Sequence, residues 1–145
     1  MKRVWPTMFL LAASCACAQA PSGSAPTGVT MKQLMVDLVY PAANDILLFI
    51  SRGEPRNESE WAGVRRGAAT LAEAGNLLAM RAGTRKGDWT KDAKLLADTG
   101  TALYRAALAK DAKALMAMAD ALDASCTTCH KQYRPDIFPA EGGSK

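Results

Sequence analysis

Apolar residues recur every three or four positions between Met31 and Tyr133, the period of amphipathic helices, and they fall into four runs. Polar or glycine- and proline-containing breaks separate the runs at residues 51–57, 83–88 and 110–111. No window alternates with a period of two, so no strand is predicted. Four helices joined by short connections predict an all-α, antiparallel up-down-up-down four-helix bundle.

The first predicted helix runs from Met31 to about Ile50. Pro41 lies inside it, cannot donate a backbone hydrogen bond, and predicts a kink or break. The inner face is expected to carry Met31, Leu34, Met35, Leu38, Ala42, Ile46 and Phe49.

The other three helices have recognisable ends. Asn57 is the expected cap of the second, with Glu60 three residues later, and Trp61 is its expected anchor. Asp88 is the expected cap of the third, and Lys110 begins a tight junction before the fourth, which Pro135 stops. The inner faces of these last two helices are expected to carry Leu95, Leu96, Thr99, Leu103 and Ala106, then Leu115, Met118, Leu122, Ser125, Cys126 and Cys129.

The N-terminal residues predict export. A basic start at Lys2 and Arg3, an apolar run to Ala13 and an Ala-Gln-Ala site ending at Ala20 are typical of a secretory signal over residues 1–20, cleaved to leave a periplasmic protein. Residues 21–30 are rich in Pro, Ser, Gly and Ala and predict a flexible leader. The helical domain then spans 31–135, and 136–145 form a tail.

Two cysteines leave the type of signal open. A small residue before Cys15 or Cys17 could instead mark a lipoprotein signal, in which case a lipid would tether the chain to a membrane. Without lipidation no membrane contact is expected, because the apolar run is too short to span a bilayer. Cleavage after Ala20 would leave two of the four cysteines, too few for a disulfide framework.

The basic composition is a weak indication of partners. The formal net charge is +4, and losing Lys2 and Arg3 with the signal lowers it to +2. So small a positive charge is a weak attraction for nucleic acid, and no nucleic-acid partner is expected.

The candidate chemistry lies in Cys126-Thr127-Thr128-Cys129-His130. C-x-x-C-H is typical of covalent attachment of haem c, and positions i, i+3 and i+4 share one helix face, so both thiols and the imidazole can meet one porphyrin. A zinc site, a thioredoxin-like dithiol and a plain structural pair remain alternatives. The mature chain offers zinc three ligands where about four are needed, and the motif follows a long helix rather than opening one.

The position of this motif at the end of a fourth helix, followed by Tyr133-Arg134, resembles the class II c-type cytochromes. These include cytochrome c-prime and its low-spin, methionine-ligated relatives, and the likeness covers Met31 to about Pro135. The resemblance implies one haem c bound covalently by Cys126 and Cys129, iron ligated by His130, and a propionate near Arg134. It also leaves a homodimer open.

The sixth iron ligand is expected to be Met35. His130 is the only histidine, which excludes a second histidine ligand. In the methionine-ligated relatives the ligand also comes from the start of the first helix, in a Leu-Met context like Leu34-Met35. Met31 remains a weaker candidate, Met35 itself could be a packing residue, and Met80 is expected in the core.

Met116 and Met118 are excluded as ligands by distance. They precede His130 on its own helix by 14 and 12 residues, which is about 18 Å or more at 1.5 Å per residue. Both are therefore expected to fill the core.

The sixth ligand separates two functions. An occupied position favours one-electron transfer with redox partner proteins, and an open one favours binding of nitric oxide or carbon monoxide, as in a five-coordinate cytochrome c-prime. The sequence shows no acid–base constellation, so an electron carrier is expected rather than an enzyme. Trp89 is expected at the haem end, either touching the porphyrin or capping the core.

Overall fold

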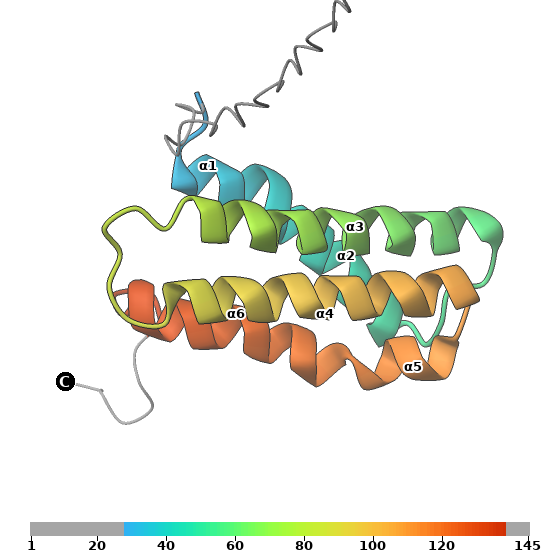
Figure 1. Cartoon of the computed structure of the whole chain (residues 1–145). Coiled ribbons are helices and arrows are strands. Elements are labelled where there is room, and N and C mark those ends of the chain that lie inside the picture. The colour runs from blue at the N-terminus through green and yellow to red at the C-terminus, as the bar shows by residue number, and fades with distance from the viewer. Residues whose placement is uncertain (1–27, 139–145) are drawn as a thin grey trace, which may run out of the picture.

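A computed structural model describes residues 28–138, and all regular structure in this range is helical (Figure 1). A continuous first helix comprises α1 (Met31–Leu34), η1 (Met35–Val39) and α2 (Tyr40–Ser51). It is followed by α3 (Glu58–Met80), α4 (Trp89–Ala109), and the pair α5 (Ala112–Ala117) and α6 (Ala119–Tyr133). Over residues 28–138, the prediction of an all-helical structure with four helical segments is confirmed. The predicted signal, Cys15 and Cys17, most of the leader and residues 139–145 lie outside the described range.

The helices α3 and α4 form the most extensive contact of the bundle, and glycines allow their backbones to meet. A Cβ atom at Gly75 would lie 2.5 Å from the backbone nitrogen of Ala97, and one at Gly100 would overlap the backbone nitrogen of Ala72. Around this seam the core is aliphatic. Its largest fully buried side chains are Ile46, Val64, Leu71, Leu103, Leu115 and Leu122.

The first helix contains a π-turn just before Pro41. The backbone N–H of Tyr40 donates to the carbonyl of Met35, five residues back, in a stretch where Pro41 can donate no hydrogen bond of its own. The predicted kink or break thus takes the form of one wide turn. The extra residue shifts the inner face from Leu38 to Val39: Leu38 is 40% exposed and Val39 only 6%, so the prediction that Leu38 faces the core is wrong.

The first helix, Met31–Ser51, is long and apolar enough to cross a membrane by length and composition alone. Core helices of soluble proteins and signal sequences pass the same test. Here the helix packs against α3 and buries Ala42, Ala43 and Ile46.

The fourth helical segment is interrupted at Met118, between α5 and α6. Lys110 adopts the left-handed conformation (φ 51°), and the Asp111 side chain accepts a 2.9 Å hydrogen bond from the backbone of Ala114, so the predicted junction is confirmed. Met118 packs against the core, as predicted. Met116, in contrast, is 39% exposed, so its predicted core role is wrong.

Two further core predictions fail for local reasons. Leu95 is 41% exposed because it precedes the buried Leu96 by one position, about 100° around the helix. Met80 is 77% exposed at the last position of α3 and is not in the core. The predicted helix N-caps are found at their expected positions. Asn57 accepts a 3.0 Å hydrogen bond from the backbone of Glu60, whereas Asp88 occupies its cap position without a side-chain hydrogen bond.

Candidate functional site

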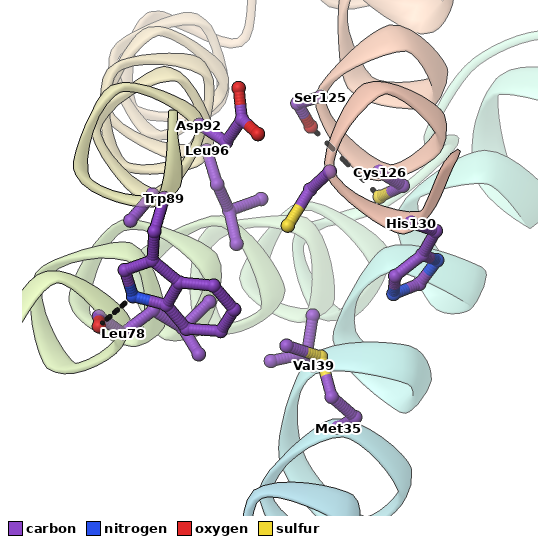
Figure 2. A pocket seen from close by; sticks show the side chains of 11 residues that line it. Met35, Val39, Leu78, Trp89, Asp92, Leu96, Ser125, Cys126 and His130 are labelled. Atoms are coloured by element: carbon purple, nitrogen blue, oxygen red, sulfur yellow. Dashed lines mark hydrogen bonds between the residues drawn. The ribbon is translucent and has the colours of Figure 1, made fainter. Parts of the chain in front are cut away.

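The end of α6 presents Cys126, Cys129 and His130 to one cavity. Figure 2 shows Cys126 and His130 there. All three are half-buried, and both cysteines are free thiols. Ser125 is buried beside them, and its hydroxyl donates a 2.7 Å hydrogen bond to the carbonyl of Leu122 one turn earlier. The helical spacing therefore brings the two thiols and the imidazole to the same site, as the sequence predicts.

The cavity draws its walls from the first helix, the end of α3, the start of α4 and the end of α6. Its volume is about 30 Å³, enough to hold at least one water molecule. Most of the wall is aliphatic or aromatic. The lining residues outside α6 are Met35, Val39, Leu78, Trp89, Asp92, Ala93 and Leu96.

Both thiols are held in the protonated form. Burial raises the pKa of Cys126, and burial together with the negative charge of Asp92 raises the pKa of Cys129 to about 11. A dithiol that exchanges disulfides needs a lowered thiol pKa, because the thiolate is the nucleophile. The electrostatics of this site therefore disfavour the thioredoxin-like alternative.

His130 has the protonation state that an iron ligand needs. Burial lowers its pKa, and the positive charge of Arg134 lowers it further, so the imidazole is neutral at neutral pH. Phe138, from the segment after α6, lies against the ring with centroids 4.7 Å apart and planes 30° apart. This aromatic contact supports the imidazole, and sequence periodicity cannot reveal it because Phe138 lies beyond the helix.

The three candidate methionines differ sharply in position. Met35 lines the cavity from η1, on a different wall from His130 (Figure 2). Met31 is half-buried against the core but does not line the cavity, and Met80 is exposed. Among them, only Met35 shares the cavity with the motif.

Arg134 lies outside the cavity lining, directly after α6. Its backbone N–H caps the helix by donating to the carbonyl of His130, at 2.7 Å. Its side chain is 49% exposed and forms a 3.4 Å ion pair with Asp136. A propionate contact would therefore require the guanidinium to leave this weak surface pair.

Trp89 lines the cavity and links α4 to α3 and α6. Its indole Nε1 donates a 2.7 Å hydrogen bond to the carbonyl of Leu78, and its ring meets Tyr133 edge to face with centroids 5.0 Å apart. The guanidinium carbon of Arg85 lies 4.4 Å from the centre of the indole ring. The expectation that Trp89 lies at the motif's end of the bundle is confirmed.

Sequence reasoning missed Asp92. It is buried in the cavity wall, and its Oδ2 atom has no hydrogen-bond partner among the described residues. The signal for its position was present, because Trp89, Asp92, Ala93 and Leu96 follow the helical period of the inner face. Aspartate is rarely buried at such a position, so a pattern defined by apolar residues alone does not include Asp92.

The donors of this cavity fit a haem c better than a bare metal ion. Within residues 28–138, no three His, Cys, Asp or Glu side chains converge on a metal position. A porphyrin supplies four nitrogen ligands itself and needs only axial donors and two thiols from the protein. The cavity is much smaller than a porphyrin, so haem binding would require the helices that line it to move apart. The main contact of α6 is with α4.

Comparison of the chain with protein-family models, with curated proteins and with solved structures finds no match.

Proposed function

We propose that this chain is a periplasmic monohaem c-type cytochrome that carries one electron between redox partner proteins. The observation that carries the proposal is that Cys126, Cys129, His130 and Met35 line a single apolar cavity. In this proposal the helices form an antiparallel up-down-up-down bundle, residues 1–20 direct export, and a lipid tether would require Cys15 or Cys17.

Four of the cavity residues have a defined part in this function. Cys126 and Cys129 would hold the haem through thioether bonds, and the neutral imidazole of His130 and the thioether of Met35 would be the iron ligands. The apolar walls limit water, which lowers the local dielectric and tunes the reduction potential. The iron of haem c supplies the one-electron chemistry.

Covalent attachment is tested by a Cys126→Ser, Cys129→Ser double variant made in a host that matures c-type cytochromes. Acidic acetone should extract haem from the double variant and not from the wild-type protein. The matched control is Thr127→Ser, Thr128→Ser on the same helical turn, which should keep its haem. Extraction of haem from the wild-type protein would show that the motif does not attach it.

The spin state of the protein tests electron transfer against gas binding. With His130 and Met35 both ligated, the oxidised protein should be low-spin with a near-infrared methionine-sulfur band, and the reduced protein should bind carbon monoxide slowly. A high-spin spectrum with rapid carbon monoxide binding would instead favour the five-coordinate, gas-binding function.

A further inference from the structure

Asp92 is a buried carboxyl group whose place in the cavity the proposed function does not explain. It is 4% exposed, its Oδ2 atom is unpartnered among the described residues, and it shares the cavity lining with Cys129 and His130. Nearly all buried polar atoms in folded proteins have a partner, so an exception calls for a physical reason.

Some features around Asp92 raise its pKa and others lower it. Burial disfavours the charged form and is the largest cause that raises its pKa, and the nearby carboxylate of Asp88 adds to this. The ammonium of Lys91 lowers the pKa, and a place in the first turn of α4 favours negative charge. Lys91 and Asp88, which are both exposed, also form an ion pair with each other at 3.9 Å.

No lining residue from the other helices supplies a counter-charge. The hydroxyls of Ser125 and Tyr133 on α6 already donate to the carbonyls of Leu122 and Lys86. Across the cavity, α3 and η1 contribute only apolar groups. The lining residues that face Asp92 from outside its own helix are Met35, Val39, Leu78, Ser125, Cys126, Cys129 and His130.

Asp92 is distinct from the proposed iron ligands. Figure 2 shows it across the cavity from Met35. Burial and the charge of Arg134 lower the pKa of His130, whereas burial and the charge of Asp92 raise the pKa of Cys129. The carboxyl group therefore acts on the cavity through its charge, from the side of the second thiol.

We propose that Asp92 binds a proton when this cavity gains an electron. A bound haem iron would take up one electron from a reduced protein partner and pass from ferric to ferrous, while one proton from hydronium would form an O–H bond on the Asp92 carboxylate and leave water. The net charge of the cavity then stays constant, which avoids the cost of an additional charge in a low dielectric. This inference rests on the proposed function, because it requires a redox centre beside Asp92.

The test is the pH dependence of the reduction potential, measured by spectroelectrochemistry on the haem-loaded protein. The wild-type potential should fall as pH rises between the pKa values of Asp92 in the oxidised and reduced states. The limiting slope is about 59 mV for each tenfold change in proton concentration, the value for one electron. Asp92→Asn should lose this slope, and Asp88→Asn, with its exposed carboxylate one turn away, should retain it.

An infrared measurement keeps the test decisive if Asp92→Asn does not load haem. Reduced-minus-oxidised spectra of wild-type protein should show a protonated carboxyl band that shifts when aspartate is labelled with carbon-13, because the label distinguishes it from haem propionates. No label-sensitive band, or the same potential slope in Asp92→Asn, would overturn the role of Asp92. Failure of the proposed function would look different, because the protein would then hold no covalent haem.

Discussion

The phenol oxygen of Tyr133 donates a 2.7 Å hydrogen bond to the backbone carbonyl of Lys86, which joins the end of α6 to the loop between α3 and α4. This contact spans 47 residues of sequence and closes the end of the bundle that carries the motif. The same ring also packs edge to face against Trp89. One side chain thus links the candidate site to two other segments.

Removal of this hydroxyl should weaken the bundle slightly. In Tyr133→Phe the ring contact with Trp89 stays, and only the hydrogen bond to the Lys86 carbonyl is lost. The urea midpoint should therefore fall by a small amount, as expected for one hydrogen bond near the surface. Tyr104→Phe, at an exposed position of α4, is the control; an equal fall there would show that the Tyr133 contact does not stabilise the bundle.

Gly75→Ala should destabilise the protein strongly. The new Cβ atom would meet backbone atoms of α4 at Ala93 and Ala97, which cannot move aside as a flexible side chain can. We expect a loss of about 2 to 3 kcal/mol in the free energy of unfolding, measured by urea denaturation.

Gly63→Ala is the matched control on the same helix. Its Cβ atom would lie 3.5 Å from the ring of Phe49, an ordinary contact, and alanine is the better helix former. This variant should gain about 0.5 to 1 kcal/mol. Equal losses at both glycines would argue against the close approach of α3 and α4.

Met35→Ala should convert the oxidised haem protein from low-spin to high-spin and abolish the near-infrared sulfur band. Met35 lines the cavity with His130, so its removal opens the sixth position to carbon monoxide. Met80→Ala, which removes an exposed methionine, should keep the wild-type spectrum. The reverse pattern would assign the ligand elsewhere.

Pro41→Ala should also reduce the low-spin fraction, although Pro41 is exposed and does not line the cavity. A donor at position 41 allows η1 to relax to an α-helix, which turns Met35 by about 100° relative to α2. The near-infrared band reports the change. Asn44→Ala, at an exposed position of α2, is the control and should leave the band intact.

The stability of the protein should depend on Asp92 in a pH-dependent way. Burial raises the folded-state pKa of this carboxyl, so its favourable contribution is complete below the unfolded pKa of about 3.9 and is lost as pH rises through the folded value. Asp92→Asn should therefore gain stability relative to wild type as pH rises from the unfolded pKa of Asp92 through its higher folded pKa.

Urea unfolding at several pH values measures this difference. Asp120→Asn, at an exposed position of α6, provides the baseline. A difference between Asp92→Asn and wild type that does not change with pH would contradict the burial of a titrating carboxyl.

Local patterns were sufficient for much of the fold. Asn57, Lys110 and Asp111 act within one helical turn, so their roles at helix ends follow from nearby residues. The exposure of Leu38, Leu95 and Met116 could not be read in this way. Leu38 is moved off the inner face by the π-turn before Pro41. Leu95 and Met116 are apolar and near an inner face, and only the packing of neighbouring helices determines how wide the buried stripe is.

For the site, the sequence by itself determined that Cys126, Cys129 and His130 share one helix face, because the period of an α-helix is a local property. Only the tertiary structure decided which other residues meet them. It brings Met35 to the cavity in place of Met31 or Met80, buries Asp92 in the wall and lays Phe138 against His130. These contacts join segments far apart in the chain or beyond regular helix, and they depend on how four helices pack rather than on any one helix.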